Sequence, residues 1–217
     1  MNITWYGQTC FRIIAQKSRN GSVNLLIDPL GKESGLRSPK LEADILLFTS
    51  PNDERIGLSS GQEEHFLVTG PGEYDVKGVY IQGIAAQTQP RKEEISKKNN
   101  IYTIEAEGIK ICHLGKFAQK ELTPDQLKII NEVDILMIPI GGGEVVDSAE
   151  AVKIMAQIEP KIIIPMYYRI PKLKIKLETL DKFLKALGVK TLESLPKLSV
   201  KKEGLSAEIA KIIVLKP

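Results

Sequence analysis

The first half of this chain is a series of short apolar runs, and this pattern restricts the fold more than any other feature of the sequence. The runs are rich in Val, Ile, Tyr and Phe, and turn pairs such as Asn20-Gly21, Pro71-Gly72 and Glu107-Gly108 separate them. They occupy residues 3–7, 10–16, 23–28, 43–50, 65–70, 76–86, 100–108 and 109–114. Such spacing predicts short strands in antiparallel meanders, packed as a sandwich.

After Gly115 the sequence alternates between helical and strand patterns. Thr123-Pro124-Asp125-Gln126 supplies an N-cap and a proline for the first helical position. A second helix is expected to begin at Asp147 or Ser148, and a third covers residues 177–188. Predicted strands occupy residues 134–140, 161–168 and 207–217. Helices must therefore cover an outer face of the sheets, in an α/β sandwich that we expect to form one domain over residues 1–217.

Composition excludes several classes of protein. The 30 basic and 27 acidic residues are too evenly balanced to indicate a nucleic-acid surface. A secretory leader pattern is absent from the first residues, and no run approaches the roughly 18 apolar residues of a membrane span, so we expect a cytoplasmic protein without a membrane partner. Cys10 and Cys112 lie within apolar runs and are expected to be buried free thiols. The polar segment 87–100 is expected to be an exposed loop.

Several strand ends together resemble the metallo-β-lactamase superfamily. The resembling segments are MNITWYGQTCFRI, LLIDP, ADILLFTSPNDERIG, VTGPGEYDVKGVYIQGI, GIKICHLG, LTPDQL, VDILMIPIGGG and KIIIPMYY. They run from residue 1 to about residue 168 in the order that this family uses. The resemblance implies a four-layer αββα sandwich of the metallo-β-lactamase type. It also points to small bacterial Zn-dependent hydrolases, the group that includes the ascorbate-6-phosphate lactonase type.

The resemblance further implies a set of metal-binding positions, and this chain departs from the family at each of them. In the family a strand like ADILLFT leads into the pattern T-H-x-H-x-D-H-x-G, whose residues hold two zinc ions about 3.5–4 Å apart. Thr49 and Gly57 match the ends of that pattern. The vestigial metal-site positions are Ser50, Asn52, Glu54, Arg55, Thr88, Lys116 and Tyr167. The histidine usual near the first strand is Gln8 here. We therefore expect no zinc and no other cofactor.

The replacements suggest what occupies the site instead. Arg55 and Lys116 are cations, which repel a metal ion. Glu54 is expected to pair with Arg55 and Lys116, while Tyr167 fills the volume of an imidazole. Asp28 is expected to pair with Arg55 or to cap the loop backbone.

Only two histidines are present, and neither is expected to replace the lost ligands. His113 is expected to be a packed, hydrogen-bonded residue at a strand end, and His65 a surface residue.

Three functional hypotheses follow. The leading one is a non-catalytic binding or structural protein, with Arg55, Lys116 and Arg169 available to bind a small anionic molecule. The first alternative is a hydrolase with a mononuclear or metal-free site, which needs Asp53 or Glu54 as a general base.

The second alternative is a nucleic-acid-binding relative of the nuclease branches. Its only support is the basic segment YYRIPKLKIKLETLDKFLK, so we do not expect nucleic acid as a partner. The oligomeric state, including a homo-oligomer, stays open.

Overall fold

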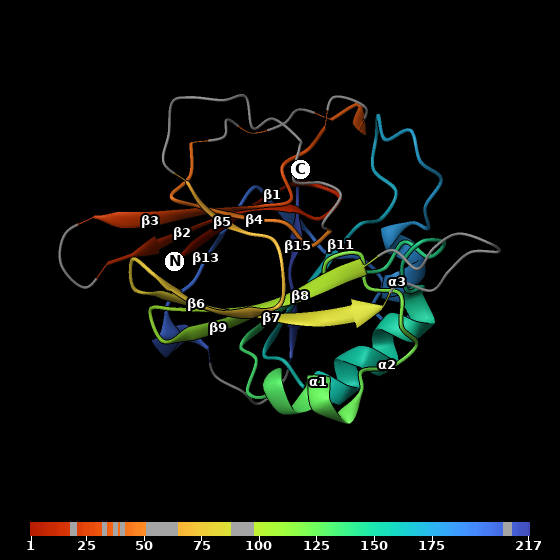
Figure 1. Ribbon diagram of the computed structural model, residues 1–217. Helices are drawn as coiled ribbons and strands as arrows, with labels where there is room; N and C mark the ends of the chain where they lie inside the picture. Colours follow the sequence, from red (N-terminus) through yellow and green to blue (C-terminus); the bar gives the residue numbers. More distant parts are fainter. Residues whose placement is uncertain are drawn as a thin grey trace.

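Two β-sheets pack face to face in the computed structural model (Figure 1). The structure describes residues 1–17, 21–31, 34–36, 39, 42–50, 65–87, 98–205 and 210–217. Within these ranges, one sheet has the strand order β13-β1-β2-β3-β4-β5 and the other has the order β14-β11-β10-β9-β8-β7-β6. A short pair is formed by β12 (Ser194–Leu195) and β15 (Val214–Leu215), near the C-terminus.

The first sheet is antiparallel at one edge and parallel at the other. Its strands are β13 (Leu198–Ser199), β1 (Asn2–Gly7), β2 (Cys10–Gln16), β3 (Ser22–Ile27), β4 (Ile45–Leu47) and β5 (Phe66–Val68). The pairs β1–β2 and β2–β3 are antiparallel, as the meander pattern predicts. The pairs β3–β4 and β4–β5 are parallel. The prediction of antiparallel meanders throughout the first half was therefore wrong for β4 and β5.

The second sheet joins a meander to a parallel half. Its strands are β6 (Gly72–Val76), β7 (Val79–Gln87), β8 (Lys98–Ala106), β9 (Ile109–His113), β10 (Ile135–Pro139), β11 (Ile162–Met166) and β14 (Lys211–Ile212). Strands β6 to β9 pair antiparallel, and β9, β10, β11 and β14 pair parallel. The expected single strand over 76–86 begins instead with a hairpin turn at Lys77 and Gly78, both in the left-handed region at φ 53° and 82°.

The hydrophobic core lies between the two sheets. In β1 every second side chain is buried, including Ile3 and Trp5, as the period of a strand requires. Strands β10 and β11 are buried along their whole lengths, as in parallel strands covered on both faces. Cys112 belongs to this core, and Cys10 belongs to a smaller cluster with Leu26 and Phe48. Both cysteines are buried and free, which confirms the sequence prediction.

The described α-helices lie on the side of the second sheet that faces away from the first (Figure 1). They are α1 (Pro124–Ile129), α2 (Ser148–Ile158) and α3 (Leu180–Ala186). Thr123 and Asp147 cap α1 and α2, and each takes part in a capping box. On the outer face of the first sheet, the smaller cluster is completed by Leu30 and Leu36 from non-helical segments.

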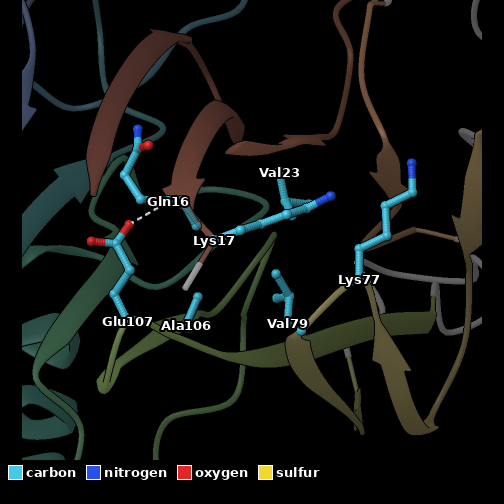
Figure 2. A pocket seen from close by; sticks show the side chains of 9 residues that line it. Gln16, Lys17, Val23, Lys77, Val79, Ala106 and Glu107 are labelled. Carbon is cyan, nitrogen blue, oxygen red and sulfur yellow. Dashed lines mark hydrogen bonds between the residues drawn. The ribbon is translucent and has the colours of Figure 1, made fainter. Parts of the chain in front are cut away.

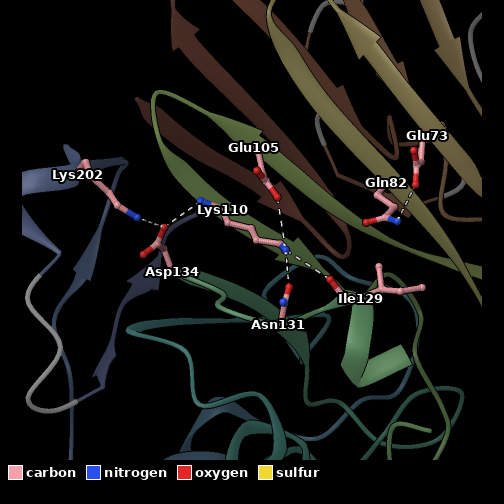
Figure 3. Close-up of polar contacts among 8 residues, drawn as sticks. All are labelled: Glu73, Gln82, Glu105, Lys110, Ile129, Asn131, Asp134 and Lys202. Atoms are coloured by element: carbon pink, nitrogen blue, oxygen red, sulfur yellow. Dashed lines mark hydrogen bonds and ion pairs between the residues drawn. The ribbon is translucent and has the colours of Figure 1, made fainter. Parts of the chain in front are cut away.

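The end of the chain is held against the second sheet by one buried carboxylate. Asp134, whose side chain is 2% exposed, forms ion pairs with Lys161 at 2.6 Å and Lys202 at 2.8 Å. It also accepts a hydrogen bond from the Lys110 backbone N–H at 2.9 Å. Figure 3 shows Lys202 and Lys110 converging on Asp134. Although burial opposes ionisation of Asp134, these partners hold the pKa of its carboxyl below the usual value.

No helix among the described residues is long and apolar enough to cross a membrane.

Candidate functional site

Four strands end in left-handed backbone at one edge of the sandwich. The residues are Gln8 after β1, Asp28 after β3, Gly115 after β9 and Tyr167 after β11, with φ of 49°, 44°, 62° and 51°. Three of them are not glycine, and non-glycine residues rarely adopt a left-handed backbone. Residues in this conformation concentrate at functional sites. Contacts described below join these ends. We call the group the strand-end cluster, and its members are Gln8, Thr9, Asp28, Thr49, Asn99, His113, Gly115, Lys116 and Tyr167.

Asp28 holds the start of the loop that follows β4. One carboxylate oxygen accepts a hydrogen bond from the Thr49 backbone N–H at 2.7 Å, and the other accepts from the Thr49 hydroxyl at 2.6 Å. Burial raises the pKa of Asp28, and this effect outweighs the hydrogen bonds from Thr49 and Thr9 and the positive charge of Lys116, which lower it. The prediction that Asp28 caps the loop backbone is confirmed. Arg55, its other predicted partner, lies outside the described residues.

Two buried asparagines of β8 hold neighbouring strand ends, Asn99 the end of β9 and Asn100 the start of the loop after β4. Asn99 and Asn100 are 2% and 3% exposed. The Asn99 side chain donates to the Leu114 carbonyl at 2.9 Å and accepts from the Lys116 backbone N–H at 2.8 Å. The backbone N–H of Asn100 donates to the Thr49 carbonyl at 2.7 Å. Lys98, Asn99 and Asn100 belong to β8, so the predicted exposed loop over 87–100 was wrong at this end.

The sequence missed both asparagines as site residues because a polar segment precedes them. The available signal was the position of an asparagine pair directly before an apolar strand.

His113 links the first strand pair to the end of β9. Its Nε2 lies 3.0 Å from the Thr9 carbonyl, and its Nδ1 accepts a hydrogen bond from the Gly115 N–H at 3.1 Å. This pattern requires a neutral ring with the proton on Nε2. Burial lowers the pKa of His113 to about 4, although its backbone hydrogen bonds oppose that shift. The expectation of a packed, hydrogen-bonded histidine is confirmed.

Gly115 turns the chain from β9 into Lys116, and no larger residue fits there. A Cβ at this position would lie 2.4 Å from Asn99 Oδ1 and 2.7 Å from Thr49 Cβ. The turn therefore brings Lys116 close to the Asp28–Thr49 pair, where its charge acts on Asp28. Lys116 is half-buried, in contrast to the many fully exposed lysines of this chain.

Tyr167 completes the cluster on the β11 side. It is 3% exposed and belongs to the main core, and its backbone N–H donates to the Gln8 carbonyl at 3.2 Å. The same carbonyl accepts from Trp5 Nε1 at 2.9 Å. Gly141 lies directly behind, because a Cβ there would be 2.2 Å from the Tyr167 carbonyl oxygen. The glycine segment after β10 is thus a close-packed turn beside the site.

The structure brings together part of the predicted set. Lys116 and Tyr167 belong to the strand-end cluster, and Ser50 follows Thr49 in a half-buried position. Arg169 is exposed two residues beyond Tyr167. The positions Asn52, Glu54, Arg55 and Thr88 lie outside the described residues, so the ion-pair network proposed for Glu54, Arg55 and Lys116 stays a prediction.

The described residues of this site do not fit a dinuclear zinc centre. Both ring nitrogens of His113 are engaged with the backbone, so neither offers a lone pair to a metal. The two oxygens of Asp28 are occupied by Thr49. His65, which was expected at the surface, is partly exposed, and its Nδ1 lies against the Ala43 carbonyl. Across the ranges that the structure describes, no three His, Cys, Asp or Glu side chains gather as metal ligands.

A hollow lies at the opposite ends of the strands. It has a volume of about 580 Å³, and Figure 2 shows Lys17 and Lys77 on either side of Val79. The carboxylate of Glu107 there is already bound by the Met1 amine at 2.8 Å and the Gln16 N–H at 2.6 Å. Buried apolar side chains, among them Val23 and Val79, close its floor.

Two mixed sheets whose strand ends form the site, with helices outside, are the architecture of the metallo-β-lactamase fold. The sequence profile of a β-lactamase superfamily domain matches residues 2–167. The chain therefore belongs to the metallo-β-lactamase superfamily.

Some of the proteins similar to this chain are named as hydrolases. A proposed Zn-dependent hydrolase of Thermotoga maritima is 28% identical, with a TM-score of 0.77 over 99% of this chain and 97% of that one. A UPF0173 metal-dependent hydrolase of Thermococcus onnurineus is 27% identical over 77% of this chain and 84% of its own length. A UPF0173 protein of Pyrococcus abyssi is 27% identical over 77% and 83% of the two chains.

More distant structures share the fold alone. A metallo hydrolase of Ignicoccus hospitalis is 17% identical, with a TM-score of 0.58 over 92% of this chain and 99% of that one.

Proposed function

We propose that the strand-end cluster binds a small anionic ligand without a dinuclear zinc centre, and that Lys116 supplies the positive charge for it. The observation that carries this proposal is the placement of Lys116. Asn99 and Gly115 fix its backbone, and its half-buried side chain acts on the buried Asp28. A cation positioned in this way can balance the charge of a bound anion as well as that of Asp28.

Loss of the metal-ligand set is part of the same proposal. The chain holds two histidines, and both are engaged with backbone carbonyls. The positions that correspond to ligands in the family carry Ser50, Lys116 and Tyr167 in the described part of the site. Cationic Lys116 disfavours a metal ion nearby because two positive charges repel.

A residual hydrolase is the second candidate, and the comparisons favour it over a non-catalytic role. Its specific support is that the similar proteins of Thermococcus onnurineus and Methanopyrus kandleri are named metal-dependent hydrolases. Such an activity needs a general base, and Asp53 and Glu54 are the residues that the sequence offers. A mononuclear site would draw its ligands from the same segment.

Metal analysis of the purified protein separates these candidates first. We expect far less than one equivalent of zinc after exposure to excess Zn²⁺ and desalting. Close to two equivalents of tightly bound zinc would refute the loss of the dinuclear centre.

Equilibrium binding tests the anion site. We expect saturable binding of inorganic phosphate or of a phosphorylated sugar acid, monitored by calorimetry at low ionic strength. Lys116→Gln should weaken it by about tenfold, since a charge-assisted contact is lost. Lys153→Gln, on the exposed face of α2, is the matched control and should leave binding unchanged. Unchanged affinity in Lys116→Gln would place the ligand elsewhere.

Turnover assays test the second candidate. Hydrolysis of generic phosphodiester and lactone substrates is measured with and without chelator. Activity that survives the chelator and disappears in Glu54→Gln would establish a metal-free hydrolase in place of a binding protein.

A further inference from the structure

The segment between β11 and α3 forms a basic hollow beside the strand-end cluster. Figure 1 shows it as the cyan and light-blue loop leading into α3. The hollow has a volume of about 800 Å³, and residues 169–177 and 179–181 line it. No member of the strand-end cluster is among them. We call it the basic groove.

The backbone of the basic groove is fixed at several points. The Arg169 N–H donates to the Glu178 carbonyl at 2.8 Å, and the Glu178 N–H donates to the Gly141 carbonyl at 2.8 Å, which closes the base of the loop. Leu173 and Leu177 pack against the main core. A Cβ on Gly35 would lie 2.9 Å from the Lys172 carbonyl oxygen, so the segment around Gly35 supports the loop from the other side.

Positive charge is concentrated along this fixed backbone. The lining includes Arg169, Lys172, Lys174 and Lys176, and Asp181 is its single carboxylate. These side chains alone carry a net charge of +3, which equals the net charge of the whole chain. All four cations are exposed, and their side chains form no ion pair with any part of the chain that the structure describes.

Glu178, which belongs to this segment but does not line the groove, does not neutralise it. One oxygen of Glu178 is paired with Lys182, and the other accepts a hydrogen bond from the Ser148 hydroxyl at 3.1 Å. Both of its oxygens are thus held on the α2–α3 side. The four cations are left to attract an external anion.

Apolar side chains alternate with these cations. Ile175, between Lys174 and Lys176, is 41% exposed, which is high for an aliphatic side chain of a folded protein. A hollow of 800 Å³ also falls within the 300–1,000 Å³ typical of small-molecule sites. It is too small to enclose a nucleic-acid duplex, and no aromatic side chain lines it for base stacking.

We propose that the basic groove binds a small organic polyphosphate, with Arg169, Lys174 and Lys176 holding the phosphates and Ile175 contacting the organic part. Lysine and arginine bind phosphate through charge-assisted hydrogen bonds. Several phosphates on one molecule match several unpaired cations better than a single charge does. This site is separate from the one centred on Lys116.

Calorimetric titration with a nucleoside triphosphate as the probe tests the proposal at low ionic strength. We expect saturable binding to the groove that is weakened by added salt, because the charges are exposed. Inorganic triphosphate should bind more weakly, since it lacks an organic part to contact Ile175. The uncharged nucleoside should show no measurable binding.

Two double variants locate the site. Lys174→Gln with Lys176→Gln should weaken binding of the nucleoside triphosphate by at least about tenfold, because two charged contacts are lost. Lys120→Gln with Lys153→Gln removes the same charge from exposed positions before α1 and on α2, and should change the affinity by less than about twofold. Thermal unfolding checks that both variants fold.

Several results would overturn the proposal. They are no saturable binding by the wild-type chain, an equal loss of affinity in both double variants, and saturable binding of a single-stranded oligonucleotide alone. The last result would identify the groove as a nucleic-acid surface. Binding of inorganic phosphate should weaken in Lys116→Gln and stay unchanged in the Lys174→Gln, Lys176→Gln variant, so failure of the anion site at Lys116 and failure of the groove can be told apart.

Discussion

Protonation of His113 should destabilise the folded chain in a defined pH range. The unfolded imidazole has a pKa near 6.5, whereas burial lowers the folded value to about 4. Between these values the unfolded state binds one more proton, so the free energy of unfolding falls as the pH falls. The stability that neutral His113 contributes to the folded chain is fully present above pH 6.5. The two pKa values differ by about 2.5 units, so full protonation of His113 lowers the free energy of unfolding by about 3 kcal/mol. The steepest dependence is near 1.4 kcal/mol per pH unit.

The hydrogen bonds of the His113 ring explain why its protonation destabilises the folded state. A second proton on His113 would sit on Nδ1, which already accepts the Gly115 N–H at 3.1 Å. Two N–H donors would then face each other inside a site that water does not reach. Gly115 would have to move, and Lys116 follows it directly in the chain.

Urea unfolding followed by the fluorescence of Trp5, the single tryptophan, measures the effect from pH 7 to pH 4. Asp28 contributes with the opposite sign, because its raised folded pKa adds stability as the pH falls through that value. The difference between wild type and His113→Gln removes this and other shared contributions. His113→Gln should be less stable at pH 7 yet lose less stability on acidification. Parallel curves for the two proteins, or an NMR titration of His113 centred near pH 6.5, would refute the reasoning.

Three further substitutions test the scaffold by urea unfolding, the first two at pH 7 and the third from pH 7 to below pH 3.8. Gly115→Ala should lower the free energy of unfolding by about 3 kcal/mol or more, because overpacking adds to left-handed backbone strain. Gly78→Ala is the control: its backbone is also left-handed, but a Cβ there would meet nothing within 4 Å, so the loss should be only about 1 kcal/mol. Equal losses in the two variants would contradict the packing argument. Thr49→Val should cost about 1.5–3 kcal/mol, since Asp28 loses a buried hydroxyl donor, and a neutral result would show that water replaces it. Asp134→Asn should cost about 2 kcal/mol, and its deficit should shrink below pH 3.8 as the wild-type carboxylate protonates; a constant deficit would exclude the ion pairs as its cause.

The fold could be predicted from the sequence where local signals decide it. The strand that begins the chain and the helix N-caps at Thr123 and Asp147 depend on residues close in the chain, and the structure confirms these predictions. Parallel pairing of β4 and β5 could not be predicted in this way, because strand direction depends on how distant segments meet. The Lys77-Gly78 turn was missed because Lys rarely occupies its left-handed position.

The candidate site was predictable where strand-end motifs indicate it, but not where distant segments must meet. Asp28, Lys116 and Tyr167 were identified by resemblance at strand ends, and the structure places them in one cluster. Asn99 and Thr9 were missed, because polar residues beside turns normally indicate solvent exposure. Their burial arises only when β8 and the β1–β2 turn meet the end of β9.

The left-handed strand ends have a consequence for how the site could change. Gln8, Asp28 and Tyr167 are held in this conformation by hydrogen bonds to protein groups, and Gly115 by close packing. The backbone conformation of the four strand ends therefore does not depend on which side chains provide the chemistry of the site. Substitutions at Ser50 or Lys116 can alter charge and ligand preference while this frame stays in place, so such a chain can exchange one chemistry for another through side chains alone.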